Sequence, residues 1–433
     1  MFSMGTIMRA CAPNENVNRD TFAKGLFCKE CGKSFPLSMS NACDECFAPL
    51  EVRYEESEVE RVLSRKSISA GPSSIWRYWP LLPVKPEYGL AGLNPGMTPL
   101  RNCKNLAEEI GIRELFIKDD TVNPTYSFKD RPVAVSIPKI LEFGLSGVGC
   151  ASTGNLAGAT AAAAARYRIP CYVIVPSDTD HSKILSALAY GAKVIAVEGT
   201  YDDANRMSNL VADRLNVGFV NINLRPYYVE GSKTLSMEFV EQLGWQEPDR
   251  VIVPIGSGAL LTAVNKGLNE FRQYGISEGD CMISGTQPSG CSTVADAFAR
   301  GDDVIYPVRK PETVAESLAI GNPASGLEAL SIIRKTGGFA DAASDSEIIE
   351  GQMLLARKEG IFSEPAGGTV IASLKRKVED GTIGRDERVV CLITGNGLKT
   401  PSHLTSTVVG STYEVRPEID SILPIFSGRT ARV

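Results

Sequence analysis

The chain has 433 residues, of which 43% are apolar and 22% are charged, and its formal net charge is −6. This composition is typical of a globular protein with a sizeable core, and the length suggests roughly two to three domains. The mildly acidic balance gives no broad basic face for nucleic acid. No apolar run is long enough to predict a membrane span, and the N-terminus lacks the apolar segment of a secretory signal. We therefore expect a cytoplasmic protein without a membrane or nucleic-acid partner.

The chain divides by pattern into five segments. Residues 1–20 are expected to form a loose N-terminal arm, and residues 21–55 a compact module that carries cysteines. A stretch rich in small residues closes a linker at 56–75. Residues 76–400 then alternate short apolar runs with helical stretches, and the tail at 401–433 carries no chemical signal.

The long region reads as an α/β fold. Its apolar runs are bounded by Gly, Pro or Asp, which predicts parallel strands covered on both faces. These runs are Leu115–Lys118, Gly147–Ala151, Pro170–Pro176, Lys193–Val197, Arg250–Pro254, Met282–Thr286 and Arg388–Thr394. Helices are predicted between the runs, because alanine-rich or periodic segments separate them. The helical segments are Leu156–Arg168, Asp202–Leu215, Lys233–Gln242 and Glu347–Lys358.

The N-terminal module contains two Cys-x-x-Cys pairs. Cys28 and Cys31 form the first pair, and Cys43 and Cys46 form the second. This spacing suits a closed tetrahedral Cys₄ zinc site, which would be structural. The alternative is a ribbon-like fold without metal, whose thiols are free. Acidic residues beside the pairs argue against a nucleic-acid role for this module.

A single lysine stands out in the segment Asn123–Arg131. Lys129 follows a Pro-broken loop and begins a helical stretch, where the helix dipole and Arg131 would help to keep its amine neutral. A neutral amine is what a lysine needs to bond a carbonyl carbon covalently. The alternative is an ordinary surface lysine at the start of a helix.

Three further segments combine a strand end, small residues and hydrogen-bond donors. The first, Ala151–Gly158, opens the alanine-rich helix, and its Asn155 can donate to a phenolate oxygen. The second, Pro254–Leu260, has two glycines around Ser257 and would cradle a phosphate. The third, Leu392–Lys399, ends a strand on a hydroxyl that could bond a pyridine nitrogen. Each segment by itself could also be a simple strand-ending turn.

Together these segments resemble those of the threonine synthases, of the fold type II family that uses pyridoxal 5′-phosphate (PLP). The resemblance covers about residues 90–400 in order and spacing. The N-terminal module is also similar to that of some bacterial threonine synthases. The residues that carry the resemblance are SFKDR at 127–131, ASTGN at 151–155, PIGSGALL at 254–261, SEPA at 363–366 and TGNGLK at 394–399.

The resemblance implies two parallel-sheet α/β domains with the cofactor between them, the smaller one at about 145–225. It implies that Lys129 bonds PLP, that Asn155 faces the cofactor's O3′, and that Thr394 faces its ring nitrogen. It also implies that PLP's phosphate lies in a loop formed by Gly256, Ser257, Gly258, Ala259 and Leu260. This loop departs from the asparagine-richer form common in the family, so the resemblance carries over the loop's backbone donors but does not define its side-chain contacts. Asn396 stands where many relatives have His.

The implied reaction converts O-phosphohomoserine and water to threonine and phosphate, with Lys129 as general base. The substrate's own phosphate needs cations and donors. The candidates are Arg131, Asn223, Arg225 and Lys233. Family members of this type are often homodimers, so we expect one here.

Several other functions stay open. Cysteate synthase uses a related phosphorylated amino acid, and threonine dehydratase and cysteine synthase-like enzymes use PLP for elimination or β-replacement. A rival of another class is a non-catalytic zinc-ribbon scaffold, against which the intact Lys129, Asn155 and Thr394 argue. Only two histidines are present, which makes a His-centred hydrolytic site improbable.

Overall fold

The computed structural model describes residues 21–199, 201–404 and 412–426. The predicted arm at 1–20 lies outside the described residues. The chain separates into two compact units, residues 1–399 and 400–433. In the second unit the described residues form a short 3₁₀ helix, η7 (Pro401–Leu404), and one α-helix, α15 (Ile419–Phe426). Nowhere in the described chain is a helix both long and apolar enough to traverse a membrane.

A six-stranded sheet forms the centre of the first unit, in the order β12-β11-β10-β13-β5-β4. Its strands pair in parallel except at one edge, where β4 runs antiparallel to β5. Their bounds are β4 (Leu100–Asn102), β5 (Glu114–Asp119), β10 (Arg250–Pro254), β11 (Met282–Pro288), β12 (Ala340–Ala343) and β13 (Arg388–Ile393). All residues of β10 are buried, as a strand covered on both faces requires.

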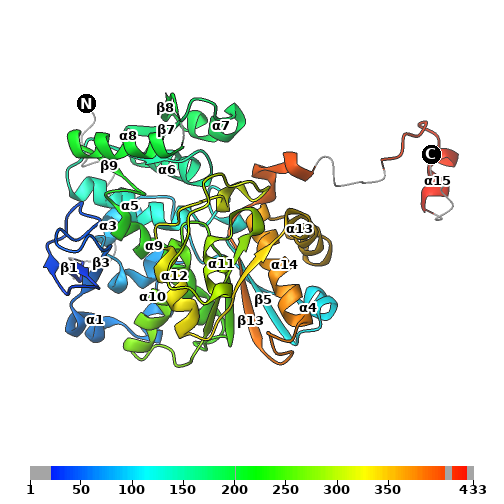
Figure 1. Cartoon of the computed structure of the whole chain (residues 1–433), viewed down its shortest axis with the longest axis horizontal. Helices are drawn as coiled ribbons and strands as arrows, with labels where there is room; N and C mark the ends of the chain where they lie inside the picture. Colours follow the sequence, from blue (N-terminus) through cyan, green and yellow to red (C-terminus); the bar gives the residue numbers. More distant parts are fainter. Residues whose placement is uncertain (1–20, 200, 405–411, 427–433) are drawn as a thin grey trace. The chain divides into compact units, whose positions relative to one another are not determined.

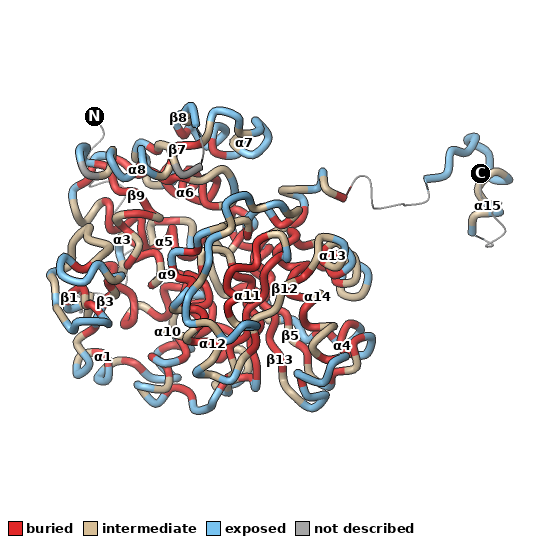
Figure 2. The backbone as a smooth tube through the Cα atoms, viewed as in Figure 1, coloured by how far each residue is buried: buried red, intermediate tan, exposed pale blue. Residues whose placement is uncertain are grey.

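Helices cover both faces of this sheet. Figure 1 shows α4, α13 and α14 to one side of β13 and β5, and α10 and α12 to the other. The bounds are α4 (Lys104–Ile110), α10 (Ala259–Gln273), α11 (Thr293–Arg300), α12 (Gly326–Lys335), α13 (Asp345–Glu359) and α14 (Pro365–Glu379). Short 3₁₀ turns, η3 (Asp120–Val122), η4 (Ser289–Cys291), η5 (Glu316–Leu318) and η6 (Gly397–Lys399), lie in the connections. Figure 2 shows the buried residues concentrated along these central strands.

A smaller four-stranded parallel sheet has the order β8-β7-β6-β9. Its strands are β6 (Gly147–Ala151), β7 (Cys171–Pro176), β8 (Lys193–Val197) and β9 (Val217–Phe219), and its helices are α6 (Asn155–Tyr167), α7 (His181–Ala189) and α8 (Tyr201–Arg214). Successive residues of β7 belong to different hydrophobic clusters, Val173 to the large core and Ile174 to a smaller one beneath α8. The sheet is therefore covered on both faces at β7, because successive side chains of a strand point to opposite faces.

The cysteine module is a three-stranded antiparallel sheet of order β2-β1-β3. Its strands are β1 (Ala23–Cys28), β2 (Ser34–Phe35) and β3 (Leu50–Tyr54). The segment 56–75, expected to be a linker, contains α1 (Glu56–Val62) and α2 (Arg65–Ser69), and buries Val59 and Ile68. The turn η2 (Ile75–Leu81) and helix α3 (Pro86–Leu90) lead from there into the large sheet.

Two long helices, α5 (Asp130–Glu142) and α9 (Arg225–Gln242), contact each other along their lengths. Nearly all of α9 is buried, because α5 covers one side of it, while α10 and strand β3 of the module contact it as well. Helix α9 thus contacts strand β3 of the cysteine module as well as α5 and α10.

The α/β prediction is confirmed, and each predicted apolar run is a strand within about a residue or two of its expected bounds. The four predicted helices also form, as α6, α8, α9 and α13. Two details differ. Strand β8 is an edge strand whose Ile195 is 44% exposed, so it is not covered on both faces. Helix α9 begins at Arg225, because Pro226 sets its first turn, eight residues before the predicted start at Lys233.

Candidate active site and cysteine cluster

Lys129 is the N-cap residue of α5, at the end of a loop that Asp130 closes. The Asp130 carboxylate accepts hydrogen bonds from the backbone N–H and the hydroxyl of Thr125, both at 2.7 Å. Burial raises the pKa of Asp130 to about 6, although the two bonds from Thr125 act in the opposite direction. These two hydrogen bonds close the turn and so fix the backbone position of Lys129.

Arg131 does not face the Lys129 amine. Its guanidinium is fully buried and pairs with Asp120 and Glu238, each at 2.6 Å. Lys118 also pairs with Glu238 at 2.8 Å. Burial opposes ionisation of Glu238, but the charges of Arg131 and Lys118 prevail and lower its pKa to about 2. Arg131 thus belongs to a buried ion-pair network beneath the loop, and it is no longer a candidate for binding the substrate's phosphate.

The Lys129 amine instead meets Tyr228 of α9. Its Nζ lies 2.6 Å from the phenolic oxygen and 4.4 Å from the centre of the Phe128 ring. Within the described part of the chain, no carboxylate forms an ion pair with this amine. Sequence reasoning assigned no role to Tyr228. The helical register of α9, had it been extended back to Arg225, would have given the tyrosine a defined face.

The end of β13 pairs directly with the lysine loop. The Phe128 N–H donates to the Thr394 carbonyl at 2.9 Å, and Ser127 forms a β-bridge with Gly395. The Asn396 N–H donates to the Tyr126 carbonyl at 3.1 Å. Thr394 is 6% exposed, and its hydroxyl has no hydrogen-bond partner among the described residues. The structure therefore places the end of β13, with Thr394, beside the loop that carries Lys129.

Glu364 links this strand end to Asn155. The Asn155 amide donates to the Glu364 carboxylate at 2.6 Å, and the Glu364 N–H donates to the Gly395 carbonyl at 2.9 Å. Burial raises the pKa of Glu364, against the hydrogen bond from Asn155 and the charges of Lys399 and Lys129. Gly395 must lack a side chain, because a Cβ there would overlap the Glu364 carboxylate. Sequence reasoning quoted Glu364 only as part of a motif and assigned it no role.

The glycine loop after β10 presents unused backbone donors. Among the described residues, nothing accepts a hydrogen bond from the N–H groups of Ser257 and Gly258, just before helix α10. Gly258 has a φ of 86°, and a Cβ there would lie 2.6 Å from the Ser325 carbonyl oxygen. The Ser325 N–H donates to the Ser257 carbonyl at 2.8 Å. The loop therefore presents these N–H groups at the N-terminus of α10, where an anion such as a phosphate can bind.

Arg225 reaches this loop from the first turn of α9. Its guanidinium donates to the Ser325 hydroxyl at 2.6 Å, and no carboxylate of the described chain forms an ion pair with it. Burial lowers the pKa of Arg225, and the charge of Glu328 opposes that shift. A half-buried guanidinium that pairs with no carboxylate of the described residues has donors left for an anionic ligand.

The other two phosphate candidates are engaged elsewhere. Lys233 is fully buried and pairs with Glu230 and Glu270, each at 2.6 Å. Asn223 accepts a hydrogen bond from the Phe219 N–H at 2.7 Å, which fixes the connection between β9 and α9. Both residues support the helix that carries Arg225 and Tyr228, and the structure does not bring either of them to the amine of Lys129.

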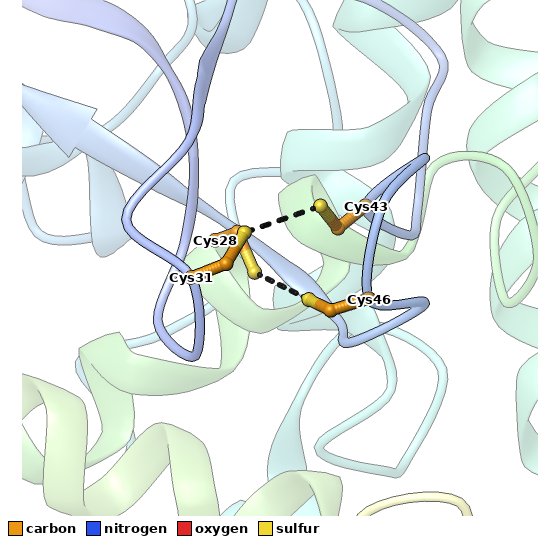
Figure 3. A group of neighbouring side chains, drawn as sticks. All are labelled: Cys28, Cys31, Cys43 and Cys46. Atoms are coloured by element: carbon orange, nitrogen blue, oxygen red, sulfur yellow. Dashed lines mark hydrogen bonds between the residues drawn. The ribbon is translucent and has the colours of Figure 1, made fainter.

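The four cysteines of the module come together in space. The Cys28 and Cys46 sulfurs lie 3.3 Å apart, and those of Cys31 and Cys43 lie 3.5 Å apart, as Figure 3 shows. All four sulfur atoms lie within 4.8 Å of one another. Four cysteines outside the module, Cys150, Cys171, Cys281 and Cys391, are buried.

Two tight turns build this cluster. The Gly32 N–H donates to the Cys28 carbonyl at 3.0 Å, and the Phe47 N–H donates to the Cys43 carbonyl at 3.1 Å. Both Gly32 and Phe47 are left-handed, with φ of 78° and 59°. Each pair thus wraps its sulfurs around a common centre, as a tetrahedral metal site requires.

The residues present fit PLP. Among the residues that the structure describes, no carboxylate pairs with the Lys129 amine, which could therefore meet an aldehyde. In the same part of the chain, the Ser257 and Gly258 amides have no acceptor and suit a phosphate, and the Thr394 hydroxyl has no partner and suits a ring nitrogen. Asn155 keeps a second amide hydrogen beside the one given to Glu364. The α/β fold and this site define a PLP-dependent enzyme of fold type II.

Comparison with known proteins agrees with this class. A family model described as "Pyridoxal-phosphate dependent enzyme" matches residues 92–395. The chain belongs to this family of PLP-dependent enzymes. It is 42% identical to a threonine synthase of Methanocaldococcus jannaschii over 86% of this chain and 92% of the relative. It is 38% identical to that of Methanosarcina acetivorans over 93% of this chain and 99% of the relative.

Solved structures share the fold at low identity. A threonine deaminase from Solanum lycopersicum superimposes with a TM-score of 0.63 over 86% of this chain and 96% of its own, at 18% identity. A fungal L-serine ammonia-lyase from Rhizomucor miehei gives a TM-score of 0.62 over 73% of this chain and 98% of its own, at 22% identity. These likenesses support the fold type and do not select among its activities.

Proposed function

We propose that the chain is a threonine synthase, which converts O-phosphohomoserine and water to L-threonine and phosphate. Threonine synthases of two archaea share 42% and 38% of their residues with this chain over most of its length. The structural observation that carries the proposal is Arg225, a half-buried guanidinium beside the glycine loop that pairs with no carboxylate of the described residues. An enzyme for a phosphorylated substrate needs a second anion site besides the cofactor's, and Arg225 supplies one.

The residues of the site have separate tasks in this proposal. When bound, PLP supplies an electron sink for the substrate's α-carbon. Lys129 carries the cofactor and, once its amine is free, takes the proton from the α-carbon. The amides of the glycine loop hold the cofactor's phosphate, Asn155 donates to its phenolic oxygen, and Thr394 bonds its ring nitrogen. Arg225 binds the γ-phosphate of the substrate and orients it for departure.

Two observations argue against the rival functions. A non-catalytic scaffold would not need a lysine amine without a carboxylate partner, unused loop amides and an unbonded hydroxyl among its described residues, because such groups cost stability. Threonine dehydratase acts on an unphosphorylated substrate and would leave Arg225 without a ligand. Cysteate synthase remains the second candidate, because its substrate also carries a phosphate.

The test of the function is phosphate release coupled to threonine formation. The purified, PLP-loaded enzyme is incubated with O-phosphohomoserine, with O-phosphoserine plus sulfite, and with threonine. The proposal predicts equal amounts of threonine and phosphate from the first mixture alone, and no product from the Lys129→Ala variant. Cysteate from the second mixture, or 2-oxobutyrate from the third at a higher kcat/KM, would replace it with a rival function.

We also propose that Cys28, Cys31, Cys43 and Cys46 bind one structural zinc ion. The clustered sulfurs and the two left-handed turns support the site. The module packs on α9, where the Tyr227 hydroxyl donates to the Ser38 carbonyl at 2.8 Å. A closed thiolate site would thereby stabilise the helix that carries Tyr228.

Elemental analysis tests the zinc proposal. Purified enzyme is expected to contain about one zinc ion per chain, and Cys31→Ser and Cys46→Ser to contain little. Cys103→Ser is the matched control, because Cys103 is a buried cysteine outside the cluster. Wild-type enzyme that holds no zinc after expression in zinc-supplemented medium would contradict the proposal.

A further inference from the structure

Helix α9 presents one face to α5, and the residues of this face recur every three or four positions. Tyr228 meets Lys129, Gly231 lies against the Arg131 backbone, and the Thr234 hydroxyl accepts from the Arg131 guanidinium at 3.2 Å. Glu238 continues the row through its ion pair with Arg131. This spacing is that of a single stripe on an α-helix. We call this contact between α5 and α9, through Tyr228, Gly231, Thr234 and Glu238, the seam. The packing along the seam fixes the position of the backbone that carries Tyr228.

Gly231 fixes the separation of the two helices in this seam. A Cβ at Gly231 would lie 2.6 Å from the Pro132 Cα and would overlap the Arg131 carbonyl oxygen. Only glycine therefore allows α9 to approach α5 so closely. Tyr228 stands three residues before it on the same face and is 7% exposed. The close approach brings the phenol to the lysine.

The environment of the Lys129 amine gives the phenol a particular task. The Nζ atom lies 2.6 Å from the Tyr228 hydroxyl and 5.3 Å from the centre of its ring. No carboxylate of the described residues pairs with this amine, and Glu364 acts on it only through longer-range charge. Tyr228 is thus the side chain that hydrogen-bonds the amine directly.

We propose that Tyr228 is a further catalytic residue, whose hydroxyl holds the Lys129 amine through both of its protonation states. A phenol can accept a hydrogen bond from an ammonium and can donate one to a neutral amine. When Lys129 takes a proton from the substrate, a C–H bond breaks, an N–H bond forms, and the electron pair stays with the carbon. The phenol turns from donor to acceptor and keeps its own proton. The role rests on the proposed function, because it concerns the proton that Lys129 moves.

The variant that tests this role is Tyr228→Phe, which keeps the ring and removes only the hydroxyl. The matched control is Tyr227→Phe, one position earlier on α9, whose hydroxyl bonds the Ser38 carbonyl in the cysteine module. Both variants lose one hydroxyl from the same buried helix. They differ in whether that hydroxyl touches Lys129.

The first measurement uses cofactor-free enzyme and does not depend on the reaction catalysed. Competitive acetylation by acetic anhydride at pH 8 is read at Lys129 by mass spectrometry. Loss of the hydroxyl that hydrogen-bonds the amine should change the rate at which Lys129 in Tyr228→Phe reacts by at least about threefold, as a lost hydrogen bond to a charged group allows. Lys129 in Tyr227→Phe should react at the wild-type rate.

The second measurement is steady-state turnover of the PLP-loaded enzyme with O-phosphohomoserine. The kcat of Tyr228→Phe should fall about 10- to 100-fold, with KM nearly unchanged, because the hydroxyl acts during proton transfer. Wild-type labelling and kcat in Tyr228→Phe would overturn the proposal. Equal losses of kcat in Tyr228→Phe and Tyr227→Phe, or loss of bound PLP from Tyr228→Phe, would mean that Tyr228 has only a structural role. Either result would also overturn the proposal. A wild-type enzyme that forms no threonine would refute the proposed function, whereas the labelling result would still decide the Lys129–Tyr228 contact.

Discussion

Asn155 donates a 2.6 Å hydrogen bond to Glu364, and this bond joins the first residue of α6 to the residue before α14. The small sheet and the large sheet therefore meet through a polar contact at the site itself. Glu364 is 5% exposed, and burial raises its pKa. The contact fixes the amide that we assign to the cofactor's phenolic oxygen.

Replacing Glu364 should show what this contact contributes. Glu364→Ala leaves the Asn155 amide without its partner, and we expect the affinity for PLP to fall about 10-fold or more, as for a lost bond to a charged group. Glu364→Gln keeps an acceptor oxygen and should recover most of the affinity. Titration of cofactor-free enzyme with PLP measures both. Glu350→Ala, on the exposed face of α13, is the control, and an unchanged affinity in Glu364→Ala would contradict this assignment.

Asp130 should make stability depend on pH. Its folded-state pKa of about 6 lies above the ordinary value of 3.8, so folded protein keeps a proton that the unfolded chain releases. Asp130 therefore destabilises the fold progressively as pH rises from about 4 to about 6, by roughly 3 kcal/mol in all. Urea unfolding of wild type and Asp130→Asn across this range measures the effect. Relative to the variant, wild type should lose stability as pH rises. A difference in the free energy of unfolding that stays constant with pH would refute the raised pKa of Asp130.

Gly231→Ala should separate the two helices of the seam. The added methyl group meets the Arg131 backbone, and overpacking of this kind costs about 1–3 kcal/mol. Because Tyr228 moves with α9, turnover should fall as well. Gly384→Ala is the control, since a Cβ there meets its nearest neighbour at 3.5 Å. Unfolding and kcat measured on both variants test the point, and a Gly231→Ala enzyme indistinguishable from Gly384→Ala would argue against the close approach.

Arg225→Met should weaken the binding of the substrate more than the binding of the cofactor. Loss of a guanidinium that binds a phosphate should raise the KM for O-phosphohomoserine about 10- to 100-fold, while PLP stays bound through the loop amides. Arg206→Met, on the exposed surface of α8, supplies the control. If Arg225→Met instead lost PLP and kept its KM, Arg225 would belong to the cofactor's phosphate.

Local patterns were enough to predict most of the fold. Buried parallel strands such as β10 are short apolar runs between turn residues, so their existence and type follow from composition and length. The edge strand β8 was also found, but not its exposure, because neighbours in a sheet are set by tertiary topology. Helix α9 was shortened in the prediction, because its buried polar residues hide the usual amphipathic period.

The site was predicted in part. Lys129 and Thr394 lie on segments whose signals were weak one by one and gained meaning only together, and the structure pairs the Lys129 loop with the end of β13. Arg131 and Lys233 were predicted as phosphate ligands because charge alone was visible in the sequence. Their carboxylate partners, Glu238 and Glu270, come from distant positions that only the fold brings close. The homodimer and the cytoplasmic location stay predictions.

The central claim is that the Lys129 amine bonds the aldehyde of PLP. Borohydride reduction of the PLP-loaded enzyme, followed by peptide mapping, tests it most directly. The account predicts one pyridoxyl label, on the peptide that contains Lys129, and none in the Lys129→Ala variant. A label on another lysine, or no label on an enzyme that still makes threonine, would contradict the account.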